Sequence, residues 1–182
     1  MAEVSAVILA AGRGTRLEPL TRNIPKCLAP VGGVPLIDRL IERISEAGID
    51  RLVVVAGYLA NVLTRHLEGS DLPLAADAEI VVNDRYADWG NFYSLLVAEA
   101  ALAGQTFIKI DGDVLIDDQV LPRVLEAPGP AVIAVDRSVV LGDEEMKVRT
   151  DGAGHVIELS KSLAPEDAAG ESIGIERIDA EA

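Results

Sequence analysis

Short apolar runs rich in β-branched residues alternate with amphipathic segments along most of this chain. The first run, Val4 to Leu9, precedes a helical pattern that begins at Pro35, and the second run, Arg51 to Ala56, precedes another over residues 60–68. A strand that leads through a helix into a second strand of the same sheet is a βαβ unit, whose strands run parallel and are buried on both faces. The alternation therefore predicts an α/β fold with a doubly wound, mostly parallel, Rossmann-like sheet.

The same alternation continues to residue 135. We expect further strands at residues 79–82, 106–110 and 131–135, and further helices at residues 92–102 and 117–126. Beyond them, residues 146–150 and 155–160 flank a turn rich in glycine, which predicts an appended β-hairpin. Because the chain has no repeat, low-complexity tract or evident linker, we expect residues 1–182 to form a single domain.

Charge and cysteine content exclude several classes of function. The formal net charge is −14, so a general nucleic-acid partner and an anionic membrane surface are both unfavourable. No apolar run approaches the roughly 18–20 residues that a membrane-spanning helix needs. The single cysteine, Cys27, cannot form an internal disulfide or a cysteine-based metal site. We therefore expect a cytoplasmic protein without nucleic-acid or membrane partners.

A glycine loop, Gly12-Arg13-Gly14, directly follows the first predicted strand. The spacing lacks the GxxxxGK[ST] pattern of a P-loop, and Leu17 stands where a dinucleotide-binding loop needs its third glycine. Backbone N–H groups of such a loop can still face phosphate oxygens, since glycine permits unusual dihedral angles and close approach. Thr15, Arg16 and Lys26 follow with a hydroxyl and two cations. The loop thus predicts a phosphate site, although a bare GxG is also compatible with a simple strand-to-loop connection.

Two carboxylates close the fourth predicted strand, as Asp111-Gly112-Asp113. Ligands of open α/β sheets bind at the carboxyl ends of the strands, where this segment falls. One or two carboxylates together with substrate phosphates are the usual environment of Mg²⁺. Asp113, with Asp111, is therefore the predicted Mg²⁺ site, and a simple turn is the alternative.

Aromatic residues are few but concentrated. Four of the six lie within eight positions, namely Tyr86, Trp89, Phe92 and Tyr93. Electron-rich ring faces attract cations, including quaternary ammonium groups. The segment is a candidate for binding a cationic acceptor, or Phe92 and Tyr93 simply form the packing face of a helix.

Several motifs together resemble the nucleotidyltransferase superfamily that activates sugar phosphates and phospho-alcohols. The motifs are LAAGRGTRL (9–17), PKCLAP (25–30), GVPLIDRL (33–40), VAGY (55–58), Asp111-Gly-Asp113 and the segment around Lys161. The segment NDRYAD…NFYSL (83–95) is similar to bacterial phosphocholine cytidylyltransferases, and MKV (146–148) and GESIG (170–174) to 2-aminoethylphosphonate cytidylyltransferases.

The resemblance implies a set of site residues. Arg16 and Lys26 would bind and neutralise the triphosphate. Asp113, with Asp111 as a second candidate ligand, would hold Mg²⁺ as the cofactor. The residues implied to surround the nucleotide are Leu9, Ala10, Ala11, Gly12, Arg13, Gly14, Thr15, Gly57 and Asp111. Those implied to bind the acceptor are Tyr86, Trp89, Asn91 and Lys161.

The implied activity is Mg²⁺-dependent transfer of CMP from CTP to phosphocholine, 2-aminoethylphosphonate or a similar phospho-alcohol, with release of pyrophosphate. Sugar-phosphate enzymes of the superfamily carry Glu-Lys-Pro where this chain has Ser160-Lys161-Ser162, which favours a phospho-alcohol. The alternatives are a sugar-1-phosphate or inositol-phosphate nucleotidyltransferase, another nucleoside triphosphate as donor, and a non-catalytic nucleotide-binding domain.

The family pattern continues beyond residue 182, where it normally includes a second metal-binding aspartate. Asp179 comes too early in the chain to be that ligand. We therefore expect a nucleotidyltransferase domain truncated at its C-terminus, which could itself be inactive. The bare strand edge of an incomplete sheet could pair with a second copy in a homodimer. Cys27 is expected to be a small buried residue rather than a reactive thiol, and His66 and His155 to have no clustered partner.

Overall fold

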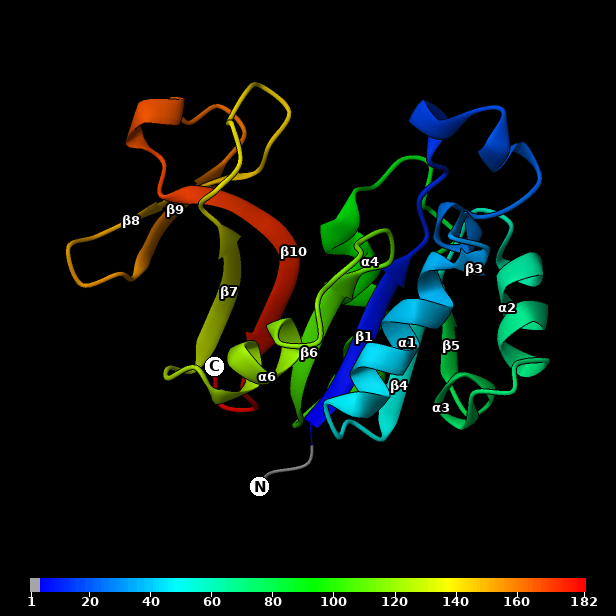
Figure 1. Ribbon diagram of the computed structural model, residues 1–182. Helices are drawn as coiled ribbons and strands as arrows, with labels where there is room; N and C mark the ends of the chain where they lie inside the picture. Colours follow the sequence, from blue (N-terminus) through cyan, green and yellow to red (C-terminus); the bar gives the residue numbers. More distant parts are fainter. Residues whose placement is uncertain (1–3) are drawn as a thin grey trace.

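Four adjacent parallel strands form one side of the sheet in the computed structural model, which describes residues 4–182 (Figure 1). Their order is β5 (Glu79–Val82), β4 (Arg51–Ala56), β1 (Val4–Ala10) and β6 (Thr106–Asp111). The central strand β1 pairs with β4 on one side and with β6 on the other, and Leu9 lies opposite both Val55 and Asp111. The carboxyl ends of β1 and β6 are therefore neighbours.

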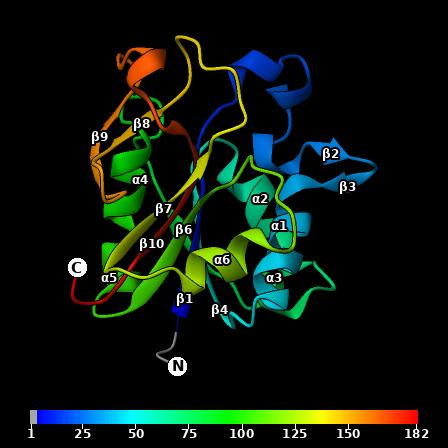
Figure 2. The ribbon, with the colours of Figure 1, turned by 60° about the vertical axis from the view of Figure 1, so that its left-hand side comes forward.

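Helices cover both faces of these strands, as Figure 2 shows. One face carries α1 (Leu36–Glu46), α2 (Ala60–Glu68), α3 (Pro73–Ala76) and α6 (Val120–Glu126), and the other carries α4 (Asn91–Val97) and α5 (Glu99–Leu102). Alternate residues of β1 are completely buried on opposite sides, with Ile8 against the first group and Val7 against the second. The predicted doubly wound, mostly parallel α/β fold is confirmed.

A strand that the sequence did not predict, β10 (Gly170–Ile178), completes the sheet. It runs antiparallel to β6 and also to β7 (Ala131–Asp136), so the predicted fifth strand is not the direct neighbour of β6. The predicted hairpin is present as β8 (Lys147–Thr150) and β9 (Val156–Ser160), and it joins the sheet through β10. The register of β10 shifts between Ser172 and Glu176, where Gly174 takes a φ of +74°.

The long segment between β1 and α1 is more ordered than the sequence indicates. It contains three single turns, Thr15–Leu17, Leu20–Arg22 and Lys26–Leu28, and a small ribbon formed by β2 (Pro30–Val31) and β3 (Val34–Pro35). The predicted helix over residues 92–102 is two shorter helices, because regular α-helical structure is interrupted at Ala98. Within residues 4–182, no helix combines the length and apolar character that crossing a bilayer would need.

Candidate functional site

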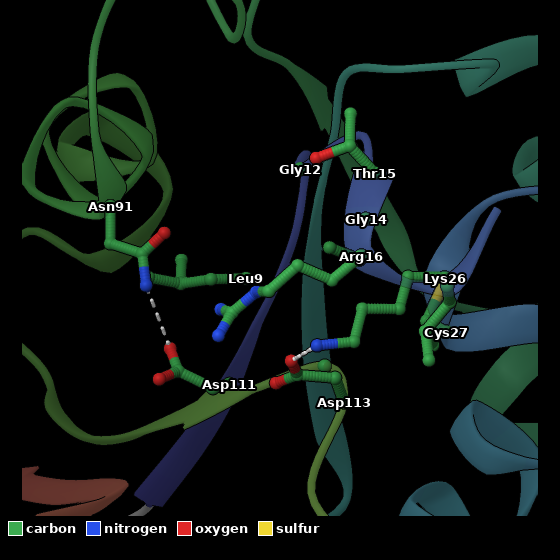
Figure 3. A pocket seen from close by; sticks show the side chains of 13 residues that line it. Leu9, Gly12, Gly14, Thr15, Arg16, Lys26, Cys27, Asn91, Asp111 and Asp113 are labelled. Atoms are coloured by element: carbon green, nitrogen blue, oxygen red, sulfur yellow. Dashed lines mark hydrogen bonds and ion pairs between the residues drawn. The ribbon is translucent and has the colours of Figure 1, made fainter. Parts of the chain in front are cut away.

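A cavity of about 300 Å³ opens at the carboxyl ends of β1 and β6 (Figure 3). It is lined by Leu9, Ala10, Gly12, Gly14, Thr15, Arg16, Leu17, Lys26, Cys27, Asn91, Asp111, Gly112 and Asp113. The sheet register explains this gathering, since the last residues of two adjacent parallel strands meet at one edge. The cavity lies where the sequence predicts the nucleotide site.

The glycine loop folds against the segment that carries Lys26. Gly14 has a φ of +66°, and a Cβ at this position would lie 2.8 Å from the Cβ of Lys26. Thr21 Oγ1 donates a hydrogen bond of 2.9 Å to the carbonyl oxygen of Gly14, which ties the loop to the next turn. Glycine is therefore needed at position 14 both for its left-handed backbone and for close contact with the lysine.

An ion pair across the cavity joins Lys26 Nζ to Asp113 Oδ2, although 87 positions separate the two residues in sequence. Buried Cys27 and Leu28 anchor the turn that presents Lys26, and Asp113 lies two residues beyond β6. Arg16 extends its guanidinium group into the same space (Figure 3). Two cations and a carboxylate from three segments therefore face one cavity.

Asp111 belongs to a partly buried network as well as to the cavity wall. Asn91 Nδ2 donates to Asp111 Oδ1 at 3.3 Å, and Lys109 Nζ lies 2.9 Å from the same oxygen. Lys109 also pairs at 2.9 Å with Glu176 of β10. A Cβ at Gly174 would collide with the Asp111 carboxylate, so the bulge in β10 makes room for that side chain.

Burial and charge act on this network in opposite directions. Burial raises the pKa of both Asp111 and Glu176, and the nearby Lys109 ammonium only partly offsets this effect. Burial alone would lower the pKa of Lys109, but the two carboxylates outweigh it and leave that pKa raised. No sequence motif marks Lys109 and Glu176, because their contact depends on β10. Asp111 is thus held by neighbours, whereas Asp113 is the more accessible carboxylate.

Three predicted nucleotide residues lie beside the cavity rather than in its wall. A Cβ at Gly57 would come within 2.7 Å of the Ala11 carbonyl oxygen, which accepts a hydrogen bond of 2.9 Å from the Tyr58 amide. Arg13 lies over the Tyr58 ring at 5.6 Å and pairs with Glu18 at 3.4 Å. Gly57, Ala11 and Arg13 therefore form an adjoining edge.

The four residues predicted to bind an acceptor are spread over a wider region. Asn91, at the start of α4, lines the cavity through its contact with Asp111. Tyr86 packs edge-on against Tyr58 at 6.2 Å, and Trp89 lies 5.1 Å from the Tyr93 ring. Trp89 remains 53% exposed. Lys161, just after β9, does not line this cavity.

Residue Glu144, which the sequence did not single out, lies between two of the predicted cationic residues. Its carboxylate is 3.8 Å from Arg16 and 3.5 Å from Lys161. The segment 137–146 that carries it leads from β7 to β8 (yellow in Figure 1), and the contact with the glycine loop is made by the long Arg16 side chain. No sequence motif marks this contact, since it depends on how the hairpin is placed.

Histidine partners also differ from expectation. His66 Nε2 lies 2.6 Å from Asp38 Oδ1, and His155 Nδ1 lies 3.1 Å from Asp151 Oδ2. The expectation that neither histidine has a clustered partner therefore needs correction, because each has one acidic partner. The Asp38 contact joins α1 and α2, and the Asp151 contact lies within the hairpin turn, so both pairs are outside the cavity.

The thiol of Cys27 is buried, and burial raises its pKa to about 12. Because the thiolate is the reactive form, we expect Ellman's reagent to leave the folded protein unmodified at pH 8 and to react once denaturant is added. Absorbance of the released thionitrobenzoate measures the reaction. Rapid modification of the folded protein would contradict the assignment of Cys27 as an inert packing residue.

The donors in the cavity suit a hard divalent cation such as Mg²⁺. Among residues 4–182, no three histidine, cysteine, aspartate or glutamate side chains gather into a protein-only metal site. The cavity offers the carboxylates of Asp113 and Asp111, which is the one-or-two-carboxylate environment that Mg²⁺ shares with substrate phosphates. The side chain of Asp113 is 36% exposed and can therefore exchange its Lys26 partner for a cation.

Comparisons with known proteins show what the chain is similar to. The MobA-like NTP transferase domain matches residues 6–170. Choline-phosphate cytidylyltransferase of Streptococcus pneumoniae is 41% identical over 108 residues, which are 59% of this chain and 44% of that enzyme. The 2-aminoethylphosphonate cytidylyltransferase of Lancefieldella rimae is 37% identical over 118 residues, 64% of this chain and 46% of that enzyme.

The fold is similar to that of a solved relative. The structure of CTP:phosphocholine cytidylyltransferase from Streptococcus pneumoniae matches with a TM-score of 0.74 and 30% identity, covering 98% of this chain and 72% of that one. The sequence alignments span less than half the length of the two curated relatives. The predicted resemblance to nucleotidyltransferases, and to these two kinds of cytidylyltransferase, is confirmed.

Proposed function

The chain belongs to the MobA-like NTP transferase domain family, and on that premise we propose that it transfers CMP from CTP to a small phospho-alcohol and releases pyrophosphate. The observation that carries this proposal is the convergence of Arg16, Lys26 and Asp113 on one cavity behind the glycine loop. A pocket with two cations beside a carboxylate suits a triphosphate bound with a divalent cation.

The proposed reaction requires positioning and charge neutralisation rather than a protein nucleophile. An oxygen of the acceptor phosphate attacks the α-phosphorus of CTP, a new P–O bond forms, and the bond to the β-phosphate oxygen breaks with its electron pair leaving on pyrophosphate. Both reactants are anions, so their approach is opposed unless cations face them. Arg16 and Lys26 provide those cations, and backbone N–H groups near Gly12 and Gly14 provide further donors.

Asp113, with Asp111 behind it, would hold Mg²⁺ in this proposal. The bound ion would supply additional neutralisation of the phosphate oxygens. Lys26 changes partner when nucleotide enters, because its ammonium then faces phosphate instead of the Asp113 carboxylate. Asn91 and Lys109 keep Asp111 oriented through their contacts with Oδ1.

The acceptor is proposed to be phosphocholine, 2-aminoethylphosphonate or a close analogue. The names of the two relatives support this choice, and so does the Ser160-Lys161-Ser162 sequence that departs from sugar-phosphate enzymes. Lys161 would face the acceptor phosphate, and the exposed rings near Trp89 are available to a cationic head group.

Release of pyrophosphate tests the proposal. The protein is incubated with Mg²⁺ and each of CTP, UTP and dTTP, in combination with phosphocholine, 2-aminoethylphosphonate, inositol phosphate or glucose-1-phosphate. We expect release above background with CTP and an amino-alcohol phosphate or phosphonate. Preference for UTP or dTTP with glucose-1-phosphate would overturn the cytidylyl assignment. If no combination of nucleotide and acceptor released pyrophosphate, a nucleotide-binding domain without turnover would be favoured.

A further inference from the structure

One carboxylate oxygen, Glu144 Oε2, lies within ion-pair distance of two cations from different parts of the chain. It is 3.8 Å from Arg16 Nη1 in the glycine loop and 3.5 Å from Lys161 Nζ beyond β9. In the proposed function these cations face the nucleotide and the acceptor phosphate, respectively. Glu144 therefore occupies a position between them that an anionic substrate group would need.

The backbone that presents Glu144 is held firmly. The amide of Gly142 donates a hydrogen bond of 2.7 Å to Glu145 Oε2, which closes the turn. The almost completely buried Lys147 donates from Nζ to the carbonyl oxygens of Gly142 at 2.6 Å and Glu145 at 3.5 Å. The turn is thus fixed from both sides, whereas the Glu144 side chain itself is 75% exposed and free to change partner.

Exposed pairs of this length are weak, typically about 0.2–1 kcal/mol, so a multiply charged phosphate group displaces the carboxylate from Arg16 and Lys161. After displacement Glu144 is an unpaired negative charge beside the acceptor phosphate. An acceptor that carries an ammonium group a few bonds from its phosphate supplies a cation to that carboxylate. An acceptor with only hydroxyl groups supplies none and leaves the two negative charges to repel.

We propose that Glu144 is a specificity-determining residue, which neutralises Arg16 and Lys161 in the empty site and becomes the counter-ion of a cationic acceptor head group when phosphates replace it. The inference rests on the proposed function and deepens it, since it selects amino-alcohol phosphates over neutral sugar or polyol phosphates. It also predicts that removal of the Glu144 carboxylate tightens the binding of CTP but lowers the preference for a cationic acceptor. A merely structural role would not give this combination.

Glu144→Gln tests the inference by equilibrium binding, so the test does not depend on turnover. Asp143→Asn is the matched control, because it removes the same charge one residue away. Calorimetry with CTP, without acceptor, is expected to show about two- to fivefold tighter binding to Glu144→Gln, since the competing carboxylate is gone. Titration with phosphocholine and with glycerol phosphate is expected to show that the preference for phosphocholine falls about two- to fivefold.

Three results would overturn the inference. One is an equal change for phosphocholine and glycerol phosphate in Glu144→Gln, a second is the same shifts in Asp143→Asn, and a third is no binding of phosphocholine to the unaltered protein. Its failure is separable from failure of the proposed function. Absence of pyrophosphate release with every acceptor contradicts turnover but leaves the two binding preferences measurable.

Discussion

Asp113→Asn is expected to lower the rate of pyrophosphate release by at least about a hundredfold, with little change in the midpoint of thermal unfolding. The substitution removes the accessible carboxylate at the end of β6 that is proposed to hold Mg²⁺, and asparagine keeps nearly the same shape. The lost pair with Lys26 involves two partly exposed side chains, so its contribution to stability is small. Initial rates with CTP and phosphocholine, and circular dichroism on heating, are the measurements.

Asp71→Asn is the control for that substitution. Asp71 is exposed, lies between α2 and α3 and does not line the cavity, so its replacement should leave the rate unchanged. Retention of more than half the rate in Asp113→Asn would show that the carboxylate has no part in the reaction.

Lys109→Met is expected to lower the free energy of unfolding by about 2–3 kcal/mol. The substitution leaves Asp111 and Glu176 facing each other, partly buried, without their shared cation. Urea unfolding followed by circular dichroism measures the free energy of unfolding. In a Lys109→Met, Glu176→Gln double variant most of the loss should be recovered, because one of the two unpaired charges is then removed.

The loss of stability caused by Lys109→Met should also depend on pH. Burial already raises the pKa of Asp111 and Glu176 in the folded protein, and loss of the ammonium raises both further. The folded state then holds protons that the unfolded chain has released, so its relative stability increases as pH falls through the folded-state pKa values. The destabilisation should therefore be largest at neutral pH and smaller under mildly acidic conditions. A loss of stability that does not change with pH would contradict the role of the two carboxylates.

The parts of the site that follow from parallel strands could be predicted from sequence. Apolar runs located β1 and β6, and the geometry of a parallel sheet places their carboxyl ends together, so the approach of Lys26 to Asp113 agrees with expectation. The parts that depend on β10 could not be predicted. Gly170 and Gly174 interrupt its strand pattern, and the shift in register that accommodates Asp111 is a tertiary feature.

The arrangement of the residues predicted to bind an acceptor could not be predicted either, because it also depends on tertiary contacts. Lys161 and Glu144 come together because the hairpin joins β10 rather than the parallel strands, and no local periodicity encodes that docking. The aromatic segment was visible in the sequence as a cluster, but ring orientation depends on the packing of Tyr86 against Tyr58. Motifs thus indicated the residues that line the cavity better than they indicated how the predicted acceptor residues are arranged.

Calorimetric titration of CTP, with and without Mg²⁺, tests most directly whether the glycine loop, Lys26 and Asp113 form one metal-assisted triphosphate site. We predict that Mg²⁺ tightens CTP binding to the unaltered protein by about tenfold or more, and that this gain disappears in Asp113→Asn. CTP binding that is equally strong with and without Mg²⁺, or an equal Mg²⁺ effect in Asp113→Asn, would contradict a shared site.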